Sequence, residues 1–255
     1  ELLAKYSDTR TWSGQSADGY RVRLGTGPRG FYAFMLAPDG GLQTVRPYAE
    51  GQKRAYMVYY SRDLLTPDPV SEAAFRCGVE SHEEHEGGLE NHSSPQVTDR
   101  GSAPIKLKKY LIAIAATGEY TKFHGGTKTL AHNAIMEALS YINLITERDF
   151  AVHFDLIANN DTIIFLDELT DPFTGNQTSG FMDQNPAAIN PLVGINNYDI
   201  GHVFGVYFPG NKATGVAIRS STCTNNKGRG CSTASPPDGE YFYKVAVHEM
   251  CHQLS

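Results

Sequence analysis

The chain has 255 residues, and its 22 basic and 28 acidic side chains give a formal net charge of −6. An acidic balance without a basic patch excludes a typical nucleic-acid-binding protein, and no run of about twenty apolar residues is present to span a membrane. The length is sufficient for a large core with a smaller unit beside it. The sequence begins at ELLAKYSDTR without a signal segment, which export would already have removed.

The first part of the chain contains short aromatic and β-branched runs, YRVRLG, GFYAFML, LQTVRPYA and RAYMVYYSRDLL. Gly, Pro and Asp turns separate these runs, so we predict a small antiparallel β unit over residues 1–80. Within it, GTGPRG fits the glycine spacing of a dinucleotide-binding loop. We reject that site, because an aromatic strand-like run follows where a helix N-terminus is required.

A polar stretch rich in Gly, Ser and Glu separates this unit from the rest of the chain. Residues 81–104 lack an apolar period and are predicted to be a linker. His82 and His85 lie three residues apart in HEEHE, but without an apolar helical context they indicate solvated charge rather than a metal site.

After the linker, KKYLIAIAATGEY predicts a buried strand, and apolar residues from Leu130 to Ile145 recur at helical spacing. FAVHFDLIAN and TIIFLD indicate two further strands, and YDIGHVFGVYF and TGVAI indicate a pair near the sheet edge. Residues 105–255 are therefore predicted to form an α/β domain with one mixed sheet and two long helices. The histidines of this region without ligand spacing are expected to be structural, on loops or element surfaces: His124, His132, His153 and His202.

The chain closes with VAVHEMCHQLS, which contains a His-Glu-x-x-His pattern after an apolar run. On a helix, His248 and His252 stand one turn apart on one face and can bind one metal ion together. Glu249 adjoins the first histidine, from where its carboxylate can take a proton from a water bound to that metal. The pattern predicts a zinc site with Glu249 as general base, and the alternative is a helix with two ordinary histidines.

Four segments resemble the catalytic domain of reprolysin-like (adamalysin-related) metzincin metalloproteases, in particular the secreted bacterial branch: YLIAIAATGEYTKFHGGT, ERDFAVHFDLIANND, NYDIGHVFGV and VAVHEMCHQ. They cover much of residues 109–252 in the order that the family has. The resemblance implies a secreted zinc endopeptidase that cleaves protein or peptide substrates. It also implies that the strand at NYDIGHVF lies along the cleft, where an extended substrate pairs with it.

The segment AFRCGVE in the first unit is similar to the cysteine switch of metzincin zymogens. This implies that residues 1–80 are a propeptide that inhibits its own protease, with the thiolate of Cys77 in the fourth position of zinc. An activating protease or a modification of the thiol would end this latency. The alternatives are that Cys77 is a small buried residue of the β unit or a disulfide partner of Cys251.

Two other cysteines, Cys223 and Cys231, flank the polar loop TNNKGRG. A short Gly-rich loop of this kind is easily closed by a disulfide, which suits an exported protein. This pairing leaves Cys77 and Cys251 over, in agreement with a switch role for Cys77.

The metzincin pattern HExxHxxGxxH places glycine where this chain has Ser255, and it places a third histidine three residues beyond the chain end. Cys251 also stands where relatives have a small glycine, and packing or a disulfide to a missing segment would explain it. We therefore expect an incomplete catalytic domain that is latent or inactive as given. The alternative function is a non-catalytic binding module on a metzincin scaffold, which Ser255 favours and the intact His-Glu-x-x-His pattern disfavours.

Overall fold

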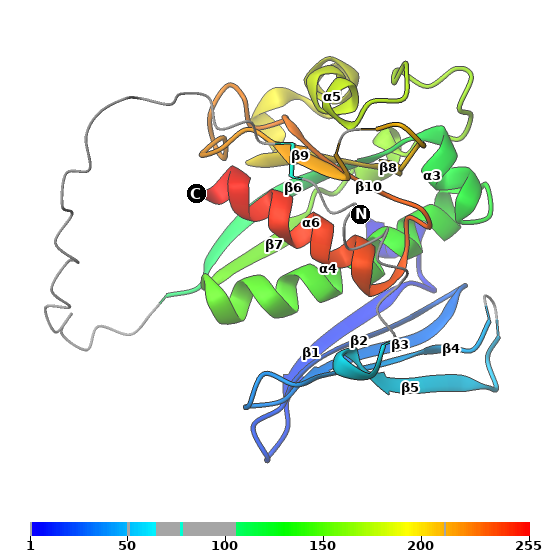
Figure 1. Ribbon diagram of the computed structural model, residues 1–255, viewed down its shortest axis with the longest axis vertical. Coiled ribbons are helices and arrows are strands. Elements are labelled where there is room, and N and C mark those ends of the chain that lie inside the picture. The colour runs from blue at the N-terminus through cyan, green and yellow to red at the C-terminus, as the bar shows by residue number, and fades with distance from the viewer. Residues whose placement is uncertain (1, 50–51, 65–76, 79–105, 212) are drawn as a thin grey trace, which may run out of the picture.

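A computed structural model describes residues 2–49, 52–64, 77–78, 106–211 and 213–255 (Figure 1). After the short helix α1 (Leu2–Lys5), a first sheet has five antiparallel strands in chain order. These strands are β1 (Arg10–Gln15), β2 (Arg21–Gly27), β3 (Gly30–Leu36), β4 (Leu42–Pro47) and β5 (Tyr56–Tyr60). The antiparallel β unit is therefore confirmed. GTGPRG closes the β2–β3 hairpin, with Gly27 paired to Gly30, rather than preceding a helix.

The second sheet is mixed and has the strand order β7-β6-β8-β10-β9. Its strands are β6 (Lys108–Ala116), β7 (Val152–Leu156), β8 (Ile200–Val206), β9 (Gly215–Ala217) and β10 (Gly230–Ala234). All pairings are parallel except that of β9 with β10. Four helices accompany it: α3 (Gly118–Phe123), α4 (Lys128–Asp149), α5 (Thr178–Val193) and α6 (Gly239–Leu254). The predicted α/β class is confirmed.

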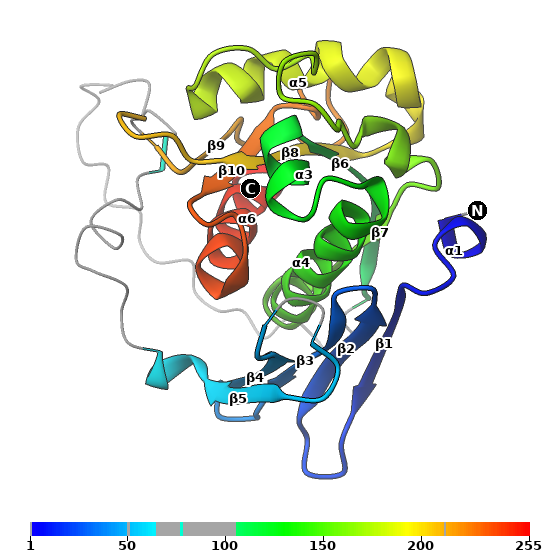
Figure 2. The same cartoon turned by 90° about the vertical axis from the view of Figure 1, so that its right-hand side faces the viewer.

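The elements lie in layers, which Figures 1 and 2 show from two sides. Helix α5 covers one face of the second sheet, and α4 and α6 cover the other face, with the first sheet beyond them. One hydrophobic cluster joins these layers, because Phe34 of β3 lies edge-on against Tyr141 of α4 and Tyr243 of α6, with ring centroids 5.4 and 6.0 Å apart. The helices α4 and α6 are therefore packed between two sheets.

One prediction about this region was wrong, and one helix was not predicted. The run TIIFLD is no strand: the 3₁₀ turn Asn160–Ile163 replaces it, and only Ile164 forms a single bridge, to Ala116 of β6. The buried Asn160 amide donates to the carbonyl of Ile114 at 2.9 Å and accepts from its N–H at 2.8 Å, so a side chain takes the place of a strand partner. The third long helix, α5, was not predicted, because Pro186 and Pro191 within it usually interrupt helices.

The position of β8 also differs from the prediction. It lies inside the sheet, between β6 and β10, while β7 and β9 form the edges. Its backbone groups are already paired on both sides, so the strand at NYDIGHVF cannot accept an added peptide strand. The edge strand that TGVAI contributes, β9, is separated from β8 by β10.

The predicted linker over 81–104, with His82 and His85, lies outside the described residues, so the boundaries 1–80, 81–104 and 105–255 stay a prediction. Within the part of the chain that the structure describes, no helix is both long and apolar enough to span a membrane.

Candidate metal centre

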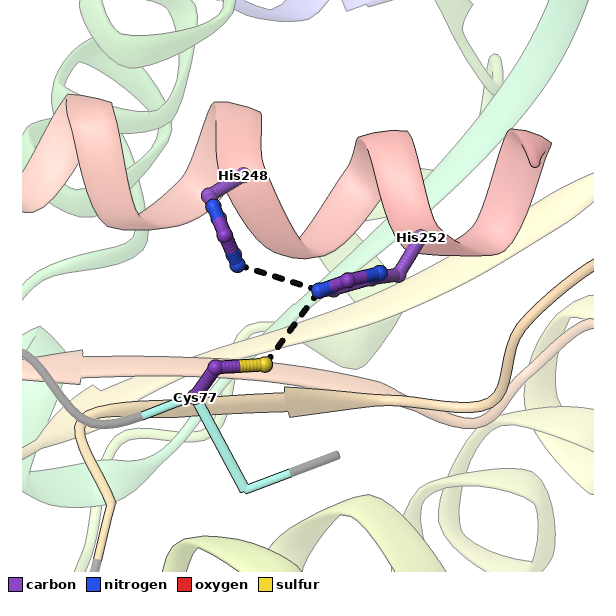
Figure 3. A group of neighbouring side chains, drawn as sticks. All are labelled: Cys77, His248 and His252. Carbon is purple, nitrogen blue, oxygen red and sulfur yellow. Dashed lines mark hydrogen bonds between the residues drawn. The ribbon is translucent and has the colours of Figure 1, made fainter. Parts of the chain in front are cut away.

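Helix α6 carries the His-Glu-x-x-His pattern. Asp238 begins the helix by accepting a hydrogen bond from the N–H of Gly239 at 2.8 Å. One face is apolar and wholly buried through Phe242, Ala246 and Met250, which fixes the rotation of the helix about its axis. His248 and His252 lie one turn apart, so both rings project from the same side of the helix (Figure 3).

Three side chains converge beside α6, as Figure 3 shows. The Nε2 atoms of His248 and His252 lie 3.0 Å apart, and Cys77 Sγ lies 3.2 Å from His252 Nε2. All three donor atoms lie within 4.8 Å of one another. The structure thus brings together the residues that the sequence named as metal ligands; their role as ligands stays a prediction.

Cys77 reaches this position through a single β-bridge to the second sheet. It forms a parallel bridge with Gly215 of β9, and the N–H of Gly78 donates to the carbonyl of Gly215 at 2.9 Å. Cys77 and Gly78 therefore contact the second sheet at its β9 edge, and the thiol of Cys77 points toward α6 (Figure 3).

The three donors fit zinc. Around one tetrahedral zinc ion, two imidazole nitrogens and a thiolate sulfur stand about 3.3–3.6 Å apart, close to the observed 3.0 and 3.2 Å. Nitrogen and sulfur are also the ligand types that zinc prefers. Burial lowers the pKa of His248 and of His252, and so favours the neutral imidazole that coordinates metal.

Glu249 lies on the same helix and is 0 % exposed. Neither carboxylate oxygen has a hydrogen-bond partner among the described residues, and burial raises the pKa of Glu249 to about 8. The group lies against the backbone of β9, where a Cβ on Gly215 would stand 2.5 Å from Glu249 Oε1. Gly215 is therefore required for the position of this carboxylate, and the sequence analysis did not identify it.

The predicted disulfide between Cys223 and Cys231 is not formed. Cys231 is wholly buried in β10 within an apolar cluster, whereas Cys223 is exposed and its Sγ lies 3.9 Å from Asp199 Oδ1. The alternative pairing of Cys77 with Cys251 is not formed either, because the thiol of Cys77 faces His252.

The remaining histidines of the second unit lie apart from the three-residue cluster. His124, His132 and His202 are all buried. His124 lies in the turn after α3 as predicted, but His132 in α4 and His202 in β8 do not lie on element surfaces, so for these two the prediction was wrong. His124 Nε2 lies 3.2 Å from the carbonyl of Pro237, and His132 stacks on Tyr6 with ring centroids 4.3 Å apart. His153 Nδ1 lies 2.5 Å from a carboxylate oxygen of Glu147.

Comparison with known proteins adds one finding. Residues 107–255, more than half of the 255-residue chain, match the family model described as Metallo-peptidase family M12B Reprolysin-like. Among curated proteins, none matches the chain. The matched region contains the second sheet and α6, whereas Cys77 and the first sheet precede it.

Proposed function

The chain belongs to the reprolysin-like M12B metallopeptidase family, and on that premise we propose that it is a zinc-dependent endopeptidase made as a latent zymogen. The observation that carries this proposal is the convergence of Cys77, His248 and His252 beside the buried Glu249. His248 and His252 would hold zinc, and Cys77 would be a further ligand in the latent form. When bound, zinc would act as a Lewis acid toward the peptide carbonyl and the attacking water.

Glu249 would move the proton in this reaction. Its carboxylate would accept a proton from the attacking water and deliver it to the leaving amine. Two features support this role: the oxygens make no hydrogen bond to the described residues, and Gly215 leaves room for them beside the β9 edge. A buried carboxyl group whose oxygens lack hydrogen-bond partners is costly, so its presence next to two ligand-type histidines favours function over packing.

The edge of β9 would bind the peptide. The Cys77–Gly78 segment pairs with Gly215 in extended form, and an extended substrate would use the same edge by adding a strand. The switch segment and the substrate would therefore compete for one edge as well as for the metal. By occupying this edge and the metal, the first unit would act as an inhibitory propeptide. An activating protease would end the inhibition by cutting the chain between the two units.

The ligand set is tested by metal analysis and X-ray absorption on the latent protein. We expect one zinc per chain with sulfur in its coordination shell, and Cys77→Ser should remove the sulfur signal. Cys77→Ser leaves both histidines in place, so the nitrogen signal should remain while zinc binds less tightly. A shell of nitrogen and oxygen alone in the unchanged protein would disprove the switch, though not the protease.

Catalysis is tested on the activated full-length protein with casein as substrate. Glu249→Gln should abolish cleavage while leaving zinc bound, because loss of a general base typically costs about 10²–10⁴-fold in rate. Equal turnover by both forms would support the non-catalytic binding module instead. We further propose that the protein is secreted, as the resemblance implies, and finding it only inside the producing cells would contradict this.

A further inference from the structure

Gln253 follows His252 directly, and its side chain points away from the metal cluster and into the second sheet. It is 0 % exposed. Its Nε2 donates to the carbonyl of Gly201 in β8 at 3.1 Å and to the carbonyl of Lys227 at 3.3 Å. Its Oε1 lies 2.9 Å from Nδ1 of His202. A primary amide with both its donors and its acceptor engaged is held in one orientation.

His202 extends these contacts across the sheet. It is wholly buried in β8, and its Nε2 lies 2.8 Å from Oγ of Ser232 in β10. Since Gln253 Oε1 only accepts, Nδ1 of His202 carries the hydrogen and Nε2 accepts from the hydroxyl of Ser232. Burial lowers the pKa of His202 to about 4, in agreement with a neutral ring. We refer to Ser232, His202 and Gln253 as the neutral chain.

The backbone at the end of α6 is held from the same side. The N–H of Ser220 donates to the carbonyl of His252 at 3.0 Å, and the N–H of Thr222 donates to the carbonyl of Gln253 at 3.0 Å. The last carbonyls of a helix have no partner within the helix, so a terminal turn frays unless it is held from outside. Here the turn that carries His252 is held by the loop before β10 and by the neutral chain.

We propose that Gln253 is a positioning residue, which through the neutral chain fixes the last turn of α6 against β8 and β10 and so holds His252 Nε2 in place for zinc. This inference rests on the proposed zinc site. His252 and Gln253 are adjacent on the helix, so their side chains leave it about 100° apart. Fixing Gln253 against the sheet therefore also fixes the direction of His252. Ligand atoms must lie within a few tenths of an ångström of their positions to bind metal well.

The test measures zinc affinity in Gln253→Met, which keeps the side-chain length and removes the amide. The matched control is Asn143→Leu in α4, because the Asn143 amide is also buried and binds strand backbone, donating to Phe154 O at 2.9 Å and accepting from its N–H at 2.8 Å. Zinc dissociation constants come from competition with a chromophoric chelator. Thermal unfolding of the metal-free forms measures the general loss of stability in each variant.

We expect Gln253→Met to weaken zinc binding about tenfold or more, the usual effect of removing a group that orients a ligand. Asn143→Leu should lower the unfolding temperature without changing zinc affinity. In the cobalt-substituted protein, Gln253→Met should also weaken and shift the visible absorption bands, which report ligand geometry. Equal zinc affinity of Gln253→Met and the unchanged protein would overturn the inference.

Two further outcomes are informative. If the unchanged protein binds no zinc, the zinc site itself fails, and the inference falls with it. If Gln253→Met does not fold, Ser232→Ala replaces it, since this change removes only the far end of the neutral chain. Zinc binding by Ser232→Ala should then weaken in the same direction by a smaller factor, and an unchanged affinity would count against the inference.

Discussion

The two ends of helix α6 are held by different chemistry. At the N-terminal end, Asp238 accepts hydrogen bonds from Arg29 at 2.9 Å and from Arg46 at 2.8 Å, and Arg46 also donates to Glu137 of α4 at 2.6 Å. We refer to these four residues as the ionic cluster. At the C-terminal end, near His252, the neutral chain makes the contacts without any formal charge.

This difference separates the contributions of the two units. Arg46 lies in β4 and Arg29 in the β2–β3 turn, so both belong to the first unit. Every member of the neutral chain lies within the region that matches the peptidase family. The first unit therefore holds the start of α6 through its arginines, whereas the neutral chain of the second unit holds the last turn, where Cys77 also contacts His252. Removing one partner of a buried ion pair leaves the other charge uncompensated and strongly destabilises the fold. Removing one partner of a neutral hydrogen bond costs less folding stability.

The largest effect is expected from Arg46→Met, which tests the ionic end. Loss of this arginine leaves the carboxylates of Glu137 and Asp238 with less compensation in a buried setting, so the free energy of unfolding should fall by about 3–5 kcal/mol. Urea unfolding measures this. The control is Arg229→Met, whose ion pair with Asp183 is more exposed and should contribute less than about 1 kcal/mol. Similar small losses in both variants would show that the ionic cluster does not hold the helix.

The next largest effect is expected from Gly215→Ala, which displaces Glu249 and leaves the contacts at both ends of α6 unchanged. In Gly215→Ala, the new Cβ would stand 2.5 Å from Glu249 Oε1, so the carboxylate must move. We expect cleavage by the activated protein to fall about 10-fold or more, the scale of a misplaced catalytic group, with zinc content unchanged. Gly205→Ala in β8 is the control, because its Cβ would meet neighbours only at 3.4 Å or beyond. Full activity of Gly215→Ala would rule out the close approach of β9 to Glu249.

A smaller effect is expected from acid. The arginines lower the pKa of Asp238 below its usual value against the opposing effect of burial. A lowered pKa in the folded state gives stability above the unfolded pKa, near 3.9, which is lost as the pH falls toward the folded pKa. Between pH 6 and pH 3, about 1 kcal/mol of the unfolding free energy should therefore be lost through Asp238. Urea unfolding of Asp238→Asn should show a weaker dependence on pH, and an identical dependence would contradict this assignment.

The sequence predicted the helix that carries the His-Glu-x-x-His pattern well because the evidence for it is local. The spacing of His248 and His252, the neighbouring Glu249 and the apolar run before them all belong to one helix of 16 residues. Cys77 was found through its resemblance to a switch segment, and the structure brings it beside His252 across 175 residues of sequence.

The remaining features depend on long-range pairing. The order of strands in a sheet is not encoded in any single strand, which is why β8 was placed at the edge that β9 occupies. His202 was expected at a surface, because a polar residue in a strand usually faces water and its partner Gln253 lies 51 residues away. No sequence pattern marks Gly215 either. Its role is to leave space for the side chain of Glu249, which belongs to another element.

The smallest effect is expected at the neutral end, from Thr222→Val. The hydroxyl of Thr222 donates to the carbonyl of Gln253 at 2.8 Å, while the backbone N–H of Thr222 binds the same carbonyl at 3.0 Å. Valine keeps the shape and the backbone bond, so the free energy of unfolding should fall by only about 0.5–1 kcal/mol. Zinc affinity should change less than in Gln253→Met, because the amide of Gln253 keeps its contacts with Gly201 and His202. A loss as large as that of Arg46→Met would mean that the two ends of α6 are equally sensitive, and that formal charge is not what distinguishes them.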